Sequence, residues 1–281
     1  MPDPETTFPK RLLGQTGLLV SCLGLGTVKI GRNQGVRYPA GFTLPDDQSV
    51  RSLLAVAQDL GINLLDTAPA YGSSEERLGR LLENRGEWIL CSKVGEEFRN
   101  GQSSFDFSGR QVRASVERSL QRLRTDYLDI VLIHSDGNDL ELLEQGDCLE
   151  ALQRLQQAGL IRAIGMSTKT VAGGLRAVEL TDLVMVTYNP LAQDDKPVIE
   201  QAAELHKGVL IKKGLLSGHL DQVNQMDQSN RDPVESSLEF IFAQSGVSSV
   251  IVGTISTDHL AHNVASVNRV IRQDRSDAAI L

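Results

Sequence analysis

The strongest constraint on the fold is a repeated pattern of short apolar runs, each of which ends in a polar residue. Eight such runs occur along the chain, and each has the length and aliphatic content of a strand buried on both faces, as parallel sheets require. The polar residues that end or follow the runs are Thr27, Asp66, Lys93, His134, Ser167, Tyr188, Lys212 and Thr254. Segments with helical periodicity lie between the runs, for example at residues 49–60, 76–82, 112–123, 149–158 and 234–242.

This alternation predicts a barrel. Successive runs end 21 to 42 residues apart, which suits one strand followed by one helix. Eight such units predict a (β/α)8 TIM barrel, whose typical size is about 250 residues, as a single domain over residues 1–281. The main alternative is a doubly wound sheet, which usually carries a glycine-rich phosphate loop after its first strand. That loop is not formed here, because Gly24 and Gly26 are followed by Lys29 where the third glycine should stand.

Three segments outside the repeat have predicted positions. The stretch RLLGQTGLLV has a turn signal between Gly14 and Gly17, which predicts a small N-terminal β-hairpin that closes the barrel floor. Residues 28–45 and 96–108 lack periodicity and follow strands, so we expect both above the barrel mouth.

Composition excludes several classes of protein. Hydrophobic residues make up 41% of the chain, so a sizeable core can form, and the net charge of −8 argues against binding nucleic acid or an anionic membrane. The apolar runs are too short to span a bilayer, and the N-terminus has no apolar signal core. The three cysteines show no disulfide or zinc pattern, which favours a reducing compartment. We therefore expect a cytoplasmic protein with no nucleic-acid or membrane partner.

Four ionisable side chains are candidates for catalysis. Asp66, Lys93 and His134 end three consecutive predicted strands, and Tyr71 lies five residues past Asp66. The carboxyl ends of barrel strands converge on one face. A single polar residue at a strand end is explained as well by solvent exposure, but chance is a poorer account of four on adjacent strands. An ammonium lowers the pKa of a nearby phenol, a carboxylate balances that ammonium, and an imidazole can orient a carbonyl oxygen. The set suits proton donation to a carbonyl during its reduction.

At these residues the chain resembles the aldo-keto reductase family. The motifs are GINLLDTAPAYGSSEERLG over residues 61–79, SKVG with Lys93 and DYLDIVLIH ending in His134, and they continue through IGMS, TYNPL and SVIVGT. The resemblance extends from Lys10 to about Val270. It implies an enzyme that binds NADPH, or less often NADH, across the top of the barrel and reduces a small aldehyde or ketone.

The resemblance also implies roles for individual residues. Tyr71 would be the general acid, Asp66 and Lys93 would tune its pKa, and His134 would orient the carbonyl. Ser167 would bind the carboxamide, Tyr188 would stack on the nicotinamide, and residues 213–218 would bind the pyrophosphate. The residues that would contact the cofactor are Thr27, Ser167, Thr168, Tyr188, Lys213, Leu215, Gly218, Thr254, His259 and Asn263.

The chain departs from the family pattern at several of these positions. Thr168 stands where the family usually has Asn, and Met185 stands where it usually has Gln. At the end of the site that would hold the adenosine 2′-phosphate, Gly253 and His259 replace Lys and Arg. We therefore expect NADP(H) to be preferred by a reduced margin, with NAD(H) possible.

Other functions are weaker alternatives. A cofactor-binding sensor or regulatory barrel with negligible turnover would also carry these departures, but the intact tetrad argues against it. A metal-dependent barrel hydrolase is disfavoured because few His and carboxylate side chains end the strands. Asp258, His259 and His262 have helical spacing without a fourth ligand, so we predict no metal site.

Overall fold

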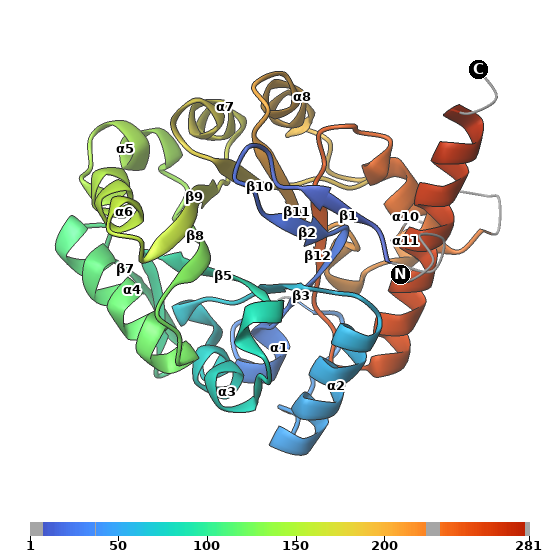
Figure 1. Ribbon diagram of the computed structural model, residues 1–281, viewed down its shortest axis with the longest axis horizontal. Helices are drawn as coiled ribbons and strands as arrows, with labels where there is room; N and C mark the ends of the chain where they lie inside the picture. Colours follow the sequence, from blue (N-terminus) through green and yellow to red (C-terminus); the bar gives the residue numbers. More distant parts are fainter. Residues whose placement is uncertain (1–7, 37, 223–230, 279–281) are drawn as a thin grey trace.

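A computed structural model describes residues 8–36, 38–222 and 231–278 of the protein. Eight parallel strands close into a barrel with helices around it, which confirms the predicted fold (Figure 1). The barrel strands are β3 (Leu23–Gly26), β4 (Leu64–Asp66), β5 (Ile89–Val94), β8 (Leu128–His134), β9 (Ile161–Ser167), β10 (Leu183–Thr187), β11 (Gly208–Lys212) and β12 (Ser249–Val252). Neighbours in the sequence pair along the sheet, and β12 pairs with β3 to close the barrel.

The helices follow the amphipathic segments of the sequence. The α-helices are α1 (Val28–Gly31), α2 (Asp47–Asp59), α3 (Ser74–Leu81), α4 (Gly109–Leu123), α5 (Asp139–Glu144), α6 (Cys148–Gln157), α7 (Val171–Leu180), α8 (Lys196–Glu204), α10 (Pro233–Phe242) and α11 (Thr257–Ala278). Short 3₁₀ helices span Pro69–Tyr71, Arg85–Glu87 and Leu216–Gly218. All five predicted helical segments fall on helices, with ends that differ by a few residues. N-cap side chains fix the starts of α2, α4, α7 and α10; for example, Asp46 accepts from the Ser49 N–H and Ser108 from the Gln111 N–H.

The predicted N-terminal hairpin is present at the barrel floor. β1 (Lys10–Leu12) pairs antiparallel with β2 (Leu19–Ser21), and the buried Leu13 and Leu18 belong to the same core cluster as the interior of the barrel. Gly14 has φ +55°, and a Cβ there would lie 2.5 Å from the Gly208 nitrogen. Only glycine allows the turn to approach the strand ends this closely.

Residues 96–105, which we expected only to lie above the mouth, form a second hairpin. β6 (Glu96–Arg99) pairs antiparallel with β7 (Gln102–Phe105). The turn residues Asn100 and Gly101 have φ of +52° and +79°, as a two-residue hairpin turn requires. The Asn-Gly pair is therefore the sequence signal for this hairpin.

In the part of the chain that the structure describes, no helix has the length and apolar character needed to cross a membrane.

Candidate active site

Strand alternation points three of the four candidate catalytic side chains into the barrel. Cys91 on β5 and Leu132 on β8 belong to the core cluster inside the barrel, and the residues beside them along each strand pack outward against the helices. Lys93 and His134 lie two residues further along these strands, so they share the inward face. Leu64 is also interior, which gives Asp66 the same orientation on β4.

Tyr71 reaches this site through a tight turn after β4. It ends the 3₁₀ helix Pro69–Tyr71, and the next residue, Gly72, has φ +63°. A Cβ at Gly72 would lie 2.2 Å from the Gly31 carbonyl oxygen, so the turn requires glycine. The Arg32 guanidinium donates to the Ala70 carbonyl at 2.9 Å and holds the turn in place.

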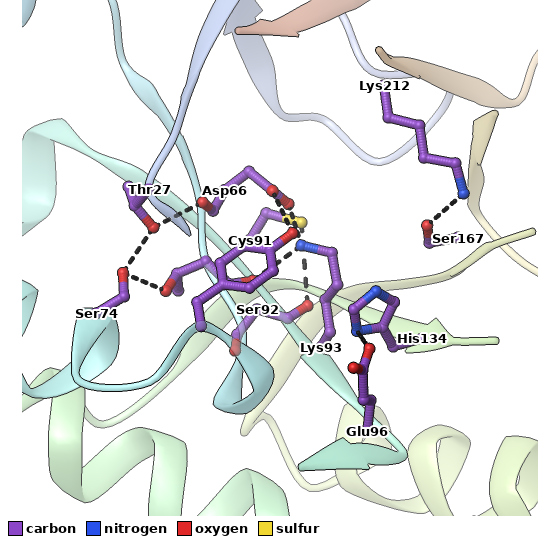
Figure 2. Close-up of polar contacts among 12 residues, drawn as sticks. Thr27, Asp66, Ser74, Cys91, Ser92, Lys93, Glu96, His134, Ser167 and Lys212 are labelled. Atoms are coloured by element: carbon purple, nitrogen blue, oxygen red, sulfur yellow. Dashed lines mark hydrogen bonds and ion pairs between the residues drawn. The ribbon is translucent and has the colours of Figure 1, made fainter. Parts of the chain in front are cut away.

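The four predicted residues converge, and Figure 2 shows Asp66, Lys93 and His134 among them. Lys93 Nζ donates to Asp66 Oδ1 at 2.5 Å and to the Thr67 carbonyl at 2.9 Å. The Tyr71 hydroxyl donates to Asp66 Oδ2 at 3.3 Å. The Tyr71 and His134 rings lie nearly perpendicular, with centroids 6.3 Å apart. One buried ion pair therefore anchors a phenol beside an imidazole at the barrel mouth.

The electrostatics keep the phenol protonated. Burial and the Asp66 carboxylate raise the pKa of Tyr71 well above its usual value, and the Lys93 ammonium lowers it by less. From the sequence, only this last effect was predicted. Burial lowers the pKa of Lys93, but Asp66 and Tyr71 raise it by more, so Lys93 remains a cation. At neutral pH the site thus holds a proton on Tyr71 oxygen.

The sequence did not identify Glu96, which the second hairpin brings to His134. Glu96 Oε2 lies 3.0 Å from His134 Nδ1 (Figure 2). Burial and the surrounding Lys and Arg cations hold the pKa of His134 well below its usual value, so the imidazole is neutral. The contact is not aligned as a hydrogen bond, but a carboxylate this close to Nδ1 favours a proton on that nitrogen.

We expect Glu96→Gln to loosen the orientation of His134. The rate of carbonyl reduction at low substrate, kcat/KM, should fall roughly tenfold to a hundredfold and its pH profile should change. The matched control is Glu97→Gln, since Glu97 lies in the same strand but pairs with Arg118. Steady-state kinetics across pH would check this. Equal losses in both variants would make the effect one of hairpin stability and not of His134.

A cavity of about 1340 Å³ extends from these four residues across the barrel mouth. It is larger than the few hundred to about 1,000 Å³ of an ordinary small-molecule site, so it has room for a cofactor together with a substrate. Eight of the ten predicted cofactor contacts line it, namely Ser167, Thr168, Lys213, Leu215, Gly218, Thr254, His259 and Asn263.

Two of the predicted contacts lie elsewhere. Tyr188 follows Val186 on the outward side of β10, and its ring stacks on Phe240 of α10 with centroids 5.1 Å apart. Its position gives Tyr188 a packing role between barrel and helix. The Thr27 hydroxyl donates to the Asp66 carbonyl at 2.8 Å and accepts from Ser74, so Thr27 braces the strand end behind the site.

The cavity has features that fit a nicotinamide dinucleotide. The loop after β11 places Lys213, Leu216 and Ser217 in the left-handed region, with φ of 50–56°. Such conformations cost of order 1 kcal/mol or more each, and turns of this kind can point backbone N–H groups at an anion. Thr168 also lines the cavity, and its Oγ1 is buried without a hydrogen-bond partner among the described residues. An amide group could supply that partner.

Metal ligands do not gather in the described part of the chain. No group of three or more His, Cys, Asp or Glu side chains there is arranged to hold a metal ion. Of the residues considered in the sequence, His262 Nε2 instead contacts Asp232 Oδ2 at 2.8 Å.

Comparison with known proteins identifies the family. The sequence model of the Aldo/keto reductase family matches residues 22–232. A solved structure assigned to the aldo-keto reductases, from Pseudomonas aeruginosa, superposes with a TM-score of 0.84 at 53% identity, over 94% of this chain and 98% of that chain. The L-galactose dehydrogenase of Arabidopsis thaliana is 30% identical over 94% of this chain and 90% of its own. The NADH-specific methylglyoxal reductase of Escherichia coli is 26% identical over 96% of both chains. The chain therefore belongs to the aldo/keto reductase family.

Proposed function

We propose that the protein is an NAD(P)H-dependent oxidoreductase that reduces a small aldehyde or ketone to an alcohol, with Tyr71 as general acid. The observation that carries the proposal is the convergence of Asp66, Tyr71, Lys93 and His134 at one end of the cavity. Membership of the aldo/keto reductase family supports nicotinamide-dependent carbonyl chemistry.

Each side chain has a separate task in this proposal. Bound NAD(P)H supplies the hydride. The Tyr71 hydroxyl donates its proton to the carbonyl oxygen, and Lys93 stabilises the phenolate left behind. Asp66 keeps the ammonium in place at 2.5 Å. His134, whose Nδ1 lies at Glu96, would present Nε2 to the substrate and accept from the hydroxyl of its alcohol form.

The protonated phenol favours reduction near neutral pH, whereas oxidation of an alcohol needs the phenolate as base. Because the pKa of Tyr71 is raised, we expect oxidation to accelerate with increasing pH while reduction stays nearly constant. One observation favours the oxidation direction: Glu96 lies at His134 Nδ1. A neutral imidazole that is protonated at Nδ1 presents Nε2 as an acceptor for the hydroxyl of an alcohol substrate. The named activity of one relative, a sugar dehydrogenase, also fits oxidation.

The cofactor would lie along the rest of the cavity. Ser167 and Thr168 would hold the carboxamide, residues 213–218 the pyrophosphate, and Thr254, His259 and Asn263 the adenosine end. The last two belong to the first turns of α11, and helix N-termini bind phosphate through their free N–H groups. We also propose that the protein works in the cytoplasm, which the three buried free cysteines support.

We expect NADPH to bind more tightly than NADH, by a smaller margin than a site with paired Lys and Arg would give. His259 is exposed at the start of α11, and a protonated imidazole pairs with a 2′-phosphate whereas a neutral one does not. The NADPH advantage carried by His259 should therefore grow as pH falls. Titration calorimetry with both nucleotides, in mild acid and mild base, would measure it.

The informative comparison is between the parent and His259→Ala, because the 2′-phosphate itself titrates near pH 6 in both proteins. Identical pH dependence in the two would remove His259 from the site. Tighter binding of NADH than of NADPH by the parent would overturn the preference.

The decisive test of the proposed function combines binding and turnover. Purified protein should bind NADPH or NADH and consume it when offered a panel of small aldehydes and ketones. Tight binding without turnover on any of them would favour the sensor alternative. Failure to bind either nucleotide would reject both.

A further inference from the structure

Lys212 is a further ionisable group at the mouth, at the end of β11. Leu210 faces the barrel interior, so the alternation of the strand turns Lys212 inward as well. Its Nζ donates to Ser167 Oγ at 2.9 Å and to the Thr168 carbonyl at 2.6 Å, and Figure 2 shows it reaching toward Ser167. Within the described ranges, no carboxylate forms an ion pair with it.

Lys212 lies close to the reacting end of the cavity. Ser167 is the direct neighbour of His134 across the β8–β9 pair, and both line the cavity with Lys212. Under the proposed function, on which this inference rests, the nicotinamide must lie within reach of a carbonyl that Tyr71 protonates. Ser167 and Thr168 are also the residues proposed to hold its carboxamide, and both already contact the Lys212 ammonium.

The two redox forms of the cofactor differ in charge at this point. The oxidised nicotinamide ring carries one positive charge, and the reduced ring is neutral. We propose that the Lys212 ammonium sets the redox preference of the cofactor site by disfavouring the oxidised nicotinamide relative to the reduced one. The rest of the nucleotide is the same in both forms and cancels from the comparison.

The surroundings allow this charge to be lost near neutral pH. Burial lowers the pKa of Lys212 to about 7. The charged groups that face it are Lys213 on its own strand end, Asp195 after β10, Lys93 on β5 and Asp139 on α5, and the two lysines lower the pKa while the two carboxylates raise it. His134 on β8 is neutral and adds no charge.

The test measures dissociation constants of NADP⁺ and NADPH across pH by titration calorimetry. In the parent, the ratio of the NADP⁺ constant to the NADPH constant should be about ten- to a hundredfold higher in mild acid than in mild base, where Lys212 loses its proton. In Lys212→Met the ratio should be low and independent of pH. In Lys212→Arg, which keeps its charge, the ratio should stay high at every pH.

The matched control is Lys213→Met, the next residue along the chain. Lys213 is proposed to face the pyrophosphate, which both redox forms share. This variant should weaken both nucleotides by the same factor and leave their ratio, and its pH dependence, close to the parental values.

Unfolding of the cofactor-free protein gives an independent readout. An unfolded lysine keeps its proton to about pH 10.4, so a folded lysine titrating near 7 makes the protein more stable as pH rises between these values. The urea midpoint of the parent should rise over this range by more than that of Lys212→Met.

The outcomes separate the two proposals. If neither nucleotide binds, the proposed function fails. If both bind and the ratio responds to pH equally in the parent, Lys212→Met and Lys212→Arg, the cofactor site stands and the role of Lys212 is overturned. If Lys212→Met does not fold, the Lys212→Arg ratio in mild base still decides, since a parental value there would contradict the proposal.

Discussion

Replacing Tyr71 with Phe is expected to lower turnover by about 10²- to 10⁴-fold while leaving the affinity for NADPH nearly unchanged. The phenol oxygen is the group proposed to hand a proton to the substrate, and it has no part in binding the ground-state nucleotide. The ring would remain between Lys93, whose Nζ lies 4.7 Å from the ring centroid, and His134. Single-turnover reduction and calorimetric titration of the cofactor would measure the two effects separately.

The fold should survive this change. Tyr71→Phe removes one hydrogen bond to Asp66, which keeps its pair with Lys93, so a loss of about 1 kcal/mol in the free energy of unfolding is expected. The matched control is Tyr127→Phe, which removes a phenol hydroxyl from a ring that packs under Arg85 and does not line the cavity. Near-parental turnover in Tyr71→Phe would refute the general-acid assignment.

The barrel could be predicted from the sequence because its signal is local. A run such as residues 130–133 is apolar and buried throughout, as expected for a strand whose two faces are both covered. The catalytic positions follow from the same rule combined with the period of two along each strand. Because Lys93 and His134 end neighbouring strands and both face inward, the sequence pattern alone predicts that their side chains lie close together.

The same period of two, applied with more care, would have separated Tyr188 from Lys212. Counting back from the strand ends puts Tyr188 on the outward side with Val186, and Lys212 on the inward side with Leu210. A resemblance between motifs assigns a role to a position along the chain, whereas strand geometry decides which face that position presents.

Glu96 could not be found in this way. Its contact with His134 depends on how the β6–β7 hairpin is oriented over the barrel. The turn sequence predicts that a hairpin forms, but it does not predict this orientation. The Phe98 ring under the Arg32 guanidinium, at 3.5 Å, ties this hairpin to the loop after β3, a contact between segments far apart in sequence. Long-range packing of loops therefore positions the part of the site that the sequence left unassigned.

Replacing Lys93 with Met is expected to damage both turnover and stability. Lys93 and Asp66 are 2% and 3% exposed, and removing one partner of a buried ion pair typically costs about 3–5 kcal/mol because the other charge is left unpaired. Turnover should fall by a factor at least comparable with that for Tyr71→Phe, since the phenolate that forms after proton transfer loses its neighbouring cation. Urea unfolding and single-turnover kinetics would measure the two losses.

The double variant Asp66→Asn with Lys93→Met separates the structural effect from the chemical one. It removes both charges, and replacing a buried pair by neutral groups of similar volume is often close to neutral for stability. We therefore expect the free energy of unfolding to recover most of its loss while turnover stays low, because no cation faces the Tyr71 oxygen. Recovery of turnover together with stability would show that Lys93 serves only to neutralise Asp66. Persistent instability in the double variant would instead assign the loss to the Thr67 carbonyl, which accepts from Lys93 Nζ at 2.9 Å and would remain buried without its donor.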